Sequence, residues 1–434
     1  MTAPQPGRRA RAVLLVANTA APYSRGLRVA RSLAAAGYAV EIAAVADGRE
    51  PGTEMDGQVL IRRYAPSGRW AGWATERRRA PGSGVRGRLR IVTTAVKVAA
   101  WPVHVRGWWH ALRAELAPAD LYHAFGILAI PAALDLARDA RTRGRAGVVV
   151  YDVIDVILES NNVDRVPAPV LAWYRVREHR WVATSDAVVT VNDAIADHLQ
   201  AAWRLATRPT VLMNCQPRWR LPDPRPDLIR EAGGLPAGRR VVLFLGRLGR
   251  ERGLEEAAAA VLDLGNAALA MLGFGPWADR LRELDADPRY AGHHVTLPAV
   301  HPDLVPLWTA SADVSIIAVP ANSLNQRLST PNKFWESLTA GTPVVVGRDL
   351  DVMRSIVESE RLGAVADPED PVDIARALAS VVDLPEAERQ EMRDRCSAIT
   401  RARYNWETAV VPYLELVATL VPSSAAADET EAAR

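Results

Sequence analysis

Short apolar runs alternate with amphipathic stretches along most of this 434-residue chain, and no other feature limits its fold so strongly. The runs fall at 12–17, 39–46, 120–125, 147–154 and 187–192, and then at 241–246, 267–273, 294–300, 313–319 and 342–347. Each run has the length of a strand that is buried on both faces, and the stretches between runs have helical spacing. Two such series predict an α/β protein with two doubly wound, Rossmann-like domains.

A change in composition separates the two series. Residues 218–238 are rich in proline and glycine, which predicts a linker between an N-terminal domain (1–217) and a C-terminal domain (239–408). A helix at 409–421 is expected to cross back to the N-terminal domain, and the tail 422–434 is expected to be disordered. We expect the domains to face each other across a cleft, with ligands beyond the carboxyl ends of the strands.

Composition and charge exclude several kinds of protein. The net charge is only +3, so no general attraction to nucleic acid is expected. No apolar run reaches the roughly 18 residues of a membrane-spanning helix, and the first run, interrupted by Asn18, is better interpreted as a strand than as a signal peptide. Cys215 and Cys396 lack metal-ligand spacing, which favours a cytoplasmic protein. The Asp-x-Asp triplets 285–287 and 349–351 lack a strand-end context, so no metal site is expected.

Cations follow the first apolar run of the second series. The run ends at Gly246, Arg247 comes next, and Arg252 precedes Gly253 and a predicted helix. Cations and free helix N–H groups at the carboxyl end of a strand suit a diphosphate. A basic surface loop is the alternative.

Two further segments of the second half are candidates for ligand contact. Gly273 and Gly275 follow the next apolar run, where they either let a ligand approach the backbone or simply form a turn. Residues 329–331 are typical of a helix start, and Glu336 lies one turn into that helix. Its carboxylate can accept hydrogen bonds from both hydroxyls of a ribose; an exposed helical glutamate is the alternative.

These motifs carry a family resemblance. GRLGRERG, GFGP and STPNKFWESLTAGTPVVV, in this order, resemble the retaining GT-B glycosyltransferases of the group 1 (family 4) type found in bacteria, as do TASADVSIIAVP and RYNWE. The similarity implies a GT-B fold and retaining transfer of a sugar from a nucleotide diphosphate sugar, UDP- or GDP-linked, to a hydroxyl acceptor, with no cofactor and no metal. It implies catalytic roles for Arg247, Arg252 and His123. It implies donor-binding roles for Gly246, Gly273, Gly275, Ser329, Thr330, Pro331, Asn332, Lys333 and Glu336.

The N-terminal half matches the family less closely. Arg25 and Asp155 are expected on the acceptor side, although a surface arginine and a helix cap are the alternatives. His123 lies near a strand end, where relatives often have a histidine that faces the cleft; a satisfied core histidine is the alternative. Ile154 stands where relatives have a histidine, and Leu328 stands where they have an acid, which leaves the transferred sugar open.

Residues 77–113 contain many arginines, several tryptophans and no acid. They fit a helix that lies on a membrane surface, which would suit a lipid-linked acceptor on the inner face of the membrane. A helix packed on its domain is the alternative. A glycolipid or polysaccharide intermediate and a natural product both remain open as acceptors. Rival functions are a GT-B nucleotide-sugar epimerase, an inverting transferase, and a non-catalytic nucleotide-binding partner subunit.

Overall fold

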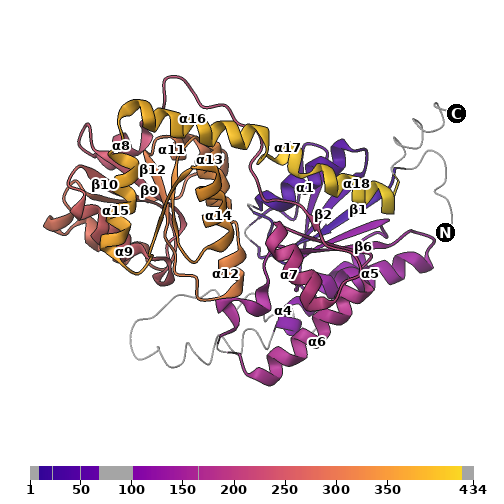
Figure 1. The fold of residues 1–434 in the computed structure, drawn as a ribbon. Coiled ribbons are helices and arrows are strands. Elements are labelled where there is room, and N and C mark those ends of the chain that lie inside the picture. Colours follow the sequence, from indigo (N-terminus) through magenta and orange to yellow (C-terminus); the bar gives the residue numbers. More distant parts are fainter. Residues whose placement is uncertain (1–8, 22, 49, 68–100, 165, 423–434) are drawn as a thin grey trace. The chain divides into compact units, whose positions relative to one another are not determined.

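A computed structural model of the chain describes residues 9–21, 23–48, 50–67, 101–164 and 166–422. It divides into two compact units (Figure 1). The N-terminal unit comprises Met1–Leu212 together with Val410–Arg434, and the C-terminal unit comprises Met213–Ala409.

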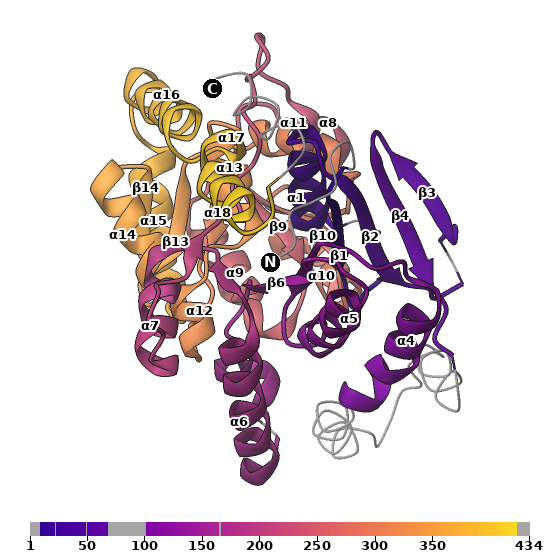
Figure 2. The same ribbon diagram turned by 90° about the vertical axis from the view of Figure 1, so that its right-hand side faces the viewer.

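The N-terminal unit is built on a sheet in the order β3-β4-β2-β1-β5-β6-β7-β8, parallel except for the antiparallel pair β3 and β4 (Figure 2). Its strands are β1 (Arg11–Leu15), β2 (Ala39–Val45), β3 (Thr53–Asp56), β4 (Val59–Tyr64), β5 (Leu121–Phe125), β6 (Val148–Val153), β7 (Ala187–Thr190) and β8 (Thr210–Val211). Its helices are α1 (Ser24–Ala35), α4 (Trp101–Glu115), α5 (Ile130–Thr142), α6 (Ala168–Thr184), α7 (Asp193–Trp203) and α18 (Val411–Leu420), with 3-10 turns at Ile157–Glu159 and Asn161–Val163. The direction of winding reverses between β1 and β5.

The C-terminal unit has a parallel sheet in the order β11-β10-β9-β12-β13-β14, which reverses between β9 and β12. Its strands are β9 (Arg240–Arg247), β10 (Ala267–Phe274), β11 (His294–Pro298), β12 (Val314–Ile317), β13 (Val344–Gly347) and β14 (Gly363–Ala366). Its helices are α8 (Leu228–Gly233), α9 (Leu254–Asp263), α10 (Ala278–Asp285), α11 (Val305–Ala310), α12 (Leu324–Leu328), α13 (Asn332–Thr339), α14 (Asp351–Glu360), α15 (Pro371–Val382), α16 (Glu386–Ala402) and α17 (Trp406–Ala409), with 3-10 turns at Arg250–Arg252, Pro288–Tyr290 and Pro302–Leu304.

Helices cover both faces of the C-terminal sheet. One apolar cluster joins the sheet to α9 and α15, and two others join it to α13, α14 and α16 and to α8 and α11. The strands between these layers are buried on both faces, which is why they read as uninterrupted apolar runs in the sequence. The two doubly wound sheets confirm the predicted α/β class.

The stretch 218–238, expected to be a linker, belongs to the C-terminal unit. Arg225 donates hydrogen bonds to the carbonyl oxygens of Ala310 and Ala312, and Arg230 on α8 pairs with the buried Asp313 at 2.9 Å. Proline keeps this stretch out of the sheet but does not prevent arginine side chains from fixing it to the surface of the unit.

The predicted helix at 409–421 corresponds to α18, which packs in the N-terminal unit. The hydroxyl of Tyr38 donates to the carbonyl of Val421 at 2.6 Å, and Tyr413 is fully buried. The tail 423–434 lies outside the described residues.

Candidate functional site

The candidate donor site lies at the carboxyl edge of the C-terminal sheet, where β9 and β12 are neighbours and the winding reverses. Ligands of doubly wound sheets bind at such switch points. β9 ends at Gly246, which has a φ of 110°, and at the exposed Arg247. The sequence therefore placed Arg247 at the edge where a ligand of this fold is bound.

Close packing of the backbone requires glycine at two positions at the end of β10. Gly273 lies opposite Gly246 in the sheet, and a Cβ on Gly273 would lie 1.8 Å from the carbonyl oxygen of Gly246. A Cβ on Gly275 would lie 2.1 Å from the carbonyl oxygen of Leu248. Both contacts are far inside van der Waals distance, so these glycines keep the ends of β9 and β10 together.

The loop after β9 is anchored beside the end of β12. Arg250–Arg252 form a 3-10 turn, and Gly253 precedes α9 with a φ of 66°. A Cβ on Gly253 would lie 2.4 Å from the carbonyl oxygen of Ala318, so only glycine fits between the two loops. The Nε atom of Arg252 is buried without a hydrogen-bond partner in the described structure. Several other arginine Nε atoms of the described residues are in the same state, so what distinguishes Arg252 is its place in the loop at the switch point of the sheet.

α13 begins at Asn332 with Pro331 at its N-cap, as the sequence predicted. Thr330 is buried, and its hydroxyl is a second polar group without a partner in the described structure. The ammonium of Lys333 lies 4.1 Å from the centroid of the Phe244 ring. Lys333 and Thr330 thus extend the polar surface of the site from the β9 loop to the start of α13.

The electrostatics place three predicted residues close together. Burial, with a smaller contribution from repulsion by Arg252, lowers the pKa of Lys333 to about 7 against the opposing attraction of Glu336. Glu336 is half-buried on α13. The structure therefore brings Arg252, Lys333 and Glu336 within electrostatic reach of one another.

The remaining predicted donor residues have local partners. The hydroxyl of Ser329 donates to the carbonyl of Gln326 at 3.2 Å, and the carboxamide of Asn332 accepts from Asn214. Leu328, at the position of the missing acid, ends the short helix α12, which the sequence analysis did not predict. Ser329 and Asn332 therefore shape the start of α13 through contacts within the unit.

The sequence argument about the Asp-x-Asp triplets was wrong for one of them. Residues 349–351 come directly after β13, although Asp351 is paired with Arg327 at 2.8 Å. In the other triplet, Asp285 bonds to His294 at 2.6 Å. Within the described ranges, no group of three or more His, Cys, Asp or Glu side chains is arranged to hold a metal ion.

In the N-terminal unit, Arg25, His123 and Asp152 form a buried polar cluster. The guanidinium of Arg25 forms a two-point ion pair with Asp152, at 2.9 and 3.0 Å, and Nε2 of His123 lies 3.1 Å from the same carboxylate. Nδ1 of His123 lies 2.9 Å from the hydroxyl of Tyr413. The His123 ring is fully buried, so its geometry matches the alternative of a satisfied core histidine. Arg25 is 3% exposed, and the surface-arginine alternative does not hold.

The protonation state of this cluster follows from its contacts. Burial alone raises the pKa of Asp152, but Arg25 and His123 outweigh it and hold the pKa below its usual value. Burial lowers the pKa of His123. The ionised Asp152 must therefore accept from Nε2–H of a neutral His123, whose Nδ1 accepts from Tyr413. Sequence reasoning missed Asp152 and Tyr413, because only the fold brings the two to one histidine.

Asp155, the other predicted acceptor-side residue, is exposed after β6. The next 3-10 turn, Ile157–Glu159, has Val156 rather than Asp155 at its N-cap and no side-chain cap. Asp155 therefore lies exposed at the carboxyl edge of the N-terminal sheet.

The tryptophan-rich segment is only partly described, because residues 77–100 lie outside the described ranges. Its last part forms α4, where Trp108 is 1% exposed and its Nε1–H donates to the carbonyl of Ala44 at 2.9 Å. Trp109 is half-buried and donates to Asp135 at 3.1 Å. These two rings pack on the domain. Across the described ranges, none of the helices combines the length and apolar character that crossing a membrane requires.

Comparison with known proteins agrees with this architecture. The chain is similar to sucrose-phosphate synthase from Thermosynechococcus elongatus, with 16% identity, a TM-score of 0.68, and coverage of 95% of this chain and 99% of that one. It is also similar to HepE from Anabaena in complex with UDP and glucose, with 15% identity, a TM-score of 0.61, and coverage of 94% and 100%. The fold is therefore the two-domain GT-B fold.

Sequence comparison adds the family. The model of the family "Glycosyl transferases group 1" matches residues 227–403. The matched residues make up most of the C-terminal unit, and the match agrees with the resemblance to group 1 glycosyltransferases drawn from the motifs.

Curated relatives match over part of their length. A probable glycosyltransferase, WbjE, from Pseudomonas aeruginosa is 28% identical over 156 residues, 34% of this chain and 37% of that one. A GDP-mannose-dependent α-(1-6)-phosphatidylinositol monomannoside mannosyltransferase from Mycobacterium tuberculosis is 28% identical over 179 residues, 39% and 43%. The chain thus spans about two fifths of the length of the curated relatives it matches.

Proposed function

We propose that the chain is a retaining glycosyltransferase that moves a sugar from a nucleotide diphosphate sugar to a hydroxyl acceptor. The observation that carries the proposal is the proximity of Arg252 and Lys333 at the switch point of a group 1 domain, where Nε of Arg252 and Oγ1 of Thr330 are among the buried polar atoms that have no partner in the described structure. Both can donate a hydrogen bond, and the diphosphate of a donor supplies acceptors.

In the proposed mechanism the protein stabilises the leaving group. Negative charge builds on the diphosphate as the sugar departs, and fixed cations placed beside it lower the barrier. Arg252 and Lys333 are close to each other, and Arg247 extends from the end of β9 at the same edge. These cations perform the neutralisation that a metal ion performs elsewhere. Glu336 accepts hydrogen bonds from the donor ribose.

UDP and GDP are the donor nucleotides to test first. The Anabaena neighbour was solved with UDP and glucose, whereas the mycobacterial relative is named as GDP-mannose-dependent. A thermal-shift screen with UDP-, GDP- and dTDP-sugars separates them, because a ligand bound only by the folded state raises the melting temperature.

On the acceptor side we propose a membrane-bound hydroxyl acceptor reached by a peripheral enzyme. The mycobacterial relative is named for a phosphatidylinositol acceptor, and residues 77–113 of this chain are basic without an acid. The exposed Asp155 contacts the acceptor in this proposal. Arg25 and His123 act by holding the carboxyl edge of the N-terminal sheet in place, since both are buried in the ion-pair cluster.

The donor-site proposal is tested with a pair of variants on one 3-10 turn. Arg252→Gln should weaken UDP or GDP binding by about tenfold to a hundredfold, the worth of hydrogen bonds to a charged group. Arg250→Gln removes the same charge from an exposed position two residues away and should change affinity less than about threefold. Calorimetric titration measures both. Equal nucleotide affinities of the two variants would contradict the assignment of the donor site to Arg252.

Two product measurements separate the rival functions. Transfer or donor hydrolysis by the purified chain excludes a non-catalytic partner subunit. NMR of the anomeric proton of the product distinguishes retention from inversion. Recovery of an epimerised nucleotide sugar would show that the chain is an epimerase and not a transferase.

A further inference from the structure

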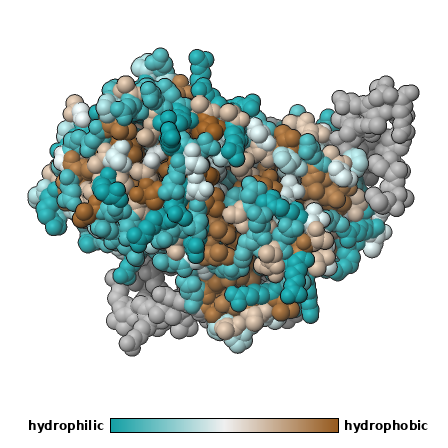
Figure 3. All heavy atoms as spheres, in the orientation of Figure 1, coloured by the Kyte–Doolittle hydropathy of each residue, from teal (hydrophilic) through white to brown (hydrophobic). Residues whose placement is uncertain are grey.

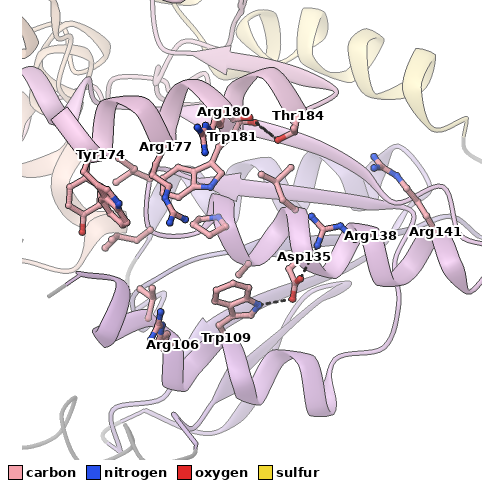
Figure 4. A pocket seen from close by; sticks show the side chains of 17 residues that line it. Arg106, Trp109, Asp135, Arg138, Arg141, Tyr174, Arg177, Arg180, Trp181 and Thr184 are labelled. Carbon is pink, nitrogen blue, oxygen red and sulfur yellow. Dashed lines mark hydrogen bonds and ion pairs between the residues drawn. The ribbon is translucent and has the colours of Figure 1, made fainter. Parts of the chain in front are cut away.

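A groove of about 680 Å³ lies within the N-terminal unit, lined by residues of α4, α5 and α6 and of the segment that joins β5 to α5 (Figure 4). The lining runs from Ile127 and Leu128, after the carboxyl end of β5, to Arg141 and Thr184 at the last turns of α5 and α6. From Pro131 to Arg141 a helix rises about 15 Å, so the groove is long enough for a good part of a hydrocarbon chain.

The floor of the groove is apolar and aromatic. Trp181 lies on the α6 side and Trp109 on the α4 side (Figure 4), and the lining also includes Ile127, Leu128 and Ala132. On α6, Trp173 is 44% exposed and Val176 beside it is 55% exposed. Figure 3 shows hydrophobic residues among hydrophilic ones in the lower part of its view, where Figure 1 draws α6. Water is a poor occupant of such a surface.

The groove is rimmed by cations. Five arginines and one aspartate contribute to its lining: Arg106, Arg138, Arg141, Arg177, Arg180 and Asp135. Asp135 is already paired with Arg113 at 2.8 Å and Arg138 at 3.5 Å and accepts from Trp109. Within the described ranges no carboxylate pairs with Arg106, Arg177 or Arg180, and Arg177 instead lies 4.6 Å over the ring of Trp173. The groove thus presents an apolar channel with unneutralised positive charge at its border.

We propose that this groove binds an anionic phospholipid of a membrane leaflet, with one acyl chain along the tryptophans and the phosphate on Arg177 and Arg180 of α6. Charge complementarity favours this ligand. An uncharged hydrocarbon ligand would leave the arginines without an anion, and inorganic phosphate would leave the apolar channel unfilled. Exposed tryptophan beside arginine is the arrangement that favours the headgroup level of a bilayer. The site would hold the N-terminal unit on the membrane.

Single-chain amphiphiles test the groove in solution. Dodecyl phosphate, below its micelle concentration, should bind at least about tenfold more tightly than inorganic phosphate or dodecyl maltoside, since each of these lacks one of the two contacts. Arg177→Gln should weaken dodecyl phosphate binding by about fivefold. Arg175→Gln, on the same helix but outside the lining, is the matched control and should bind like the unmodified chain.

Vesicles test the membrane source. Vesicles of phosphatidylcholine with phosphatidylglycerol should bind the full chain, vesicles of phosphatidylcholine alone should not, and salt should weaken the binding. Phosphatidylglycerol with brominated acyl chains should quench tryptophan fluorescence on contact. Trp109→Phe should reduce that quenching. Trp203→Phe should not, because the Trp203 ring stacks on Tyr151 and is not part of the lining.

Several outcomes overturn the proposal. Equal binding of inorganic phosphate and dodecyl phosphate would show that the arginines bind anions without a contribution from the apolar channel. Equal effects of Arg175→Gln and Arg177→Gln would show that the ligand is attracted by the positive charge of the surface in general and not by this groove. A change of oligomeric state in Arg177→Gln assigns the groove to a second copy of the chain. Donor binding at Arg252 is measured separately, so failure of this proposal leaves the proposed donor site and sugar transfer standing.

Discussion

The imidazole of His123 is bonded through Nδ1 to the hydroxyl of Tyr413, 2.9 Å away and 290 residues later in the chain. The same ring bonds through Nε2 to Asp152, which Arg25 keeps ionised. One buried histidine therefore joins the last helix of the N-terminal unit to the centre of its sheet.

Removal of the Tyr413 hydroxyl should destabilise the protein. Tyr413→Phe leaves Nδ1 of His123 buried without a donor, which costs about 1–3 kcal/mol. The melting temperature should fall by about 2–4 °C for each kcal/mol, measured by differential scanning fluorimetry. Tyr290→Phe, at a half-buried tyrosine of the C-terminal unit, is the control. An unchanged melting temperature in Tyr413→Phe would mean that the bond contributes nothing to folding.

Glu178 should make stability depend on pH. Burial raises its pKa from 4.5 to about 7, although the hydrogen bond from Tyr151 lowers it. Between those values the folded protein holds a proton that the unfolded chain releases, so this contribution is complete below about pH 4.5 and is lost as the pH rises through about 7. As the pH rises from about 4.5 to above 7, the free energy of unfolding of Glu178→Gln should therefore increase by up to about 3 kcal/mol relative to that of the unmodified chain. Urea unfolding at both pH values measures the difference, and a difference that does not change with pH would contradict the assignment.

Lys333 should take up a proton when a diphosphate binds. Its pKa of about 7 leaves a large neutral fraction near neutral pH, and a neighbouring anion favours the charged form. Titration calorimetry in buffers of different ionisation enthalpy should therefore show net proton uptake at about pH 8. Lys333→Met should abolish that uptake and bind with less dependence on pH. Identical uptake by both proteins would place the protonation elsewhere.

Gly273→Ala should disrupt the donor edge. Its methyl group would lie 1.8 Å from the carbonyl oxygen of Gly246, so β9 and β10 must separate where Arg247 begins. Such overpacking typically costs about 1–3 kcal/mol and should also weaken nucleotide binding. Gly52→Ala, with open space around the new methyl group, is the control. Normal nucleotide affinity in Gly273→Ala would show that the strand ends adapt without loss.

The apolar runs predicted the central strands well, because strands covered by helices on both faces must be apolar throughout. The run at 241–246 became β9 (Arg240–Arg247), and the helix expected from Asn332 is α13. The pattern missed β4, whose run VLIRRY is interrupted by two arginines. It also missed the polar β3 (TEMD), the two-residue β8 and the short β14 (GAVA). Edge and short strands bury too little surface to leave a clear signal.

The sequence by itself determined the class of the fold and the cations at the carboxyl edge of the C-terminal sheet, since both follow from local pattern. Buried strands are apolar, Arg247 ends one of them, and Arg252 lies in the loop that follows. Only the tertiary structure decided which polar groups lack a partner and which are satisfied. His123 has the same sequence context in either case, and it is a core residue because Tyr413 and Asp152 reach it from distant parts of the chain. The groove of Trp109 and Trp181 is likewise decided by packing, because its walls come from helices separated along the chain, and only their arrangement shows which faces remain uncovered.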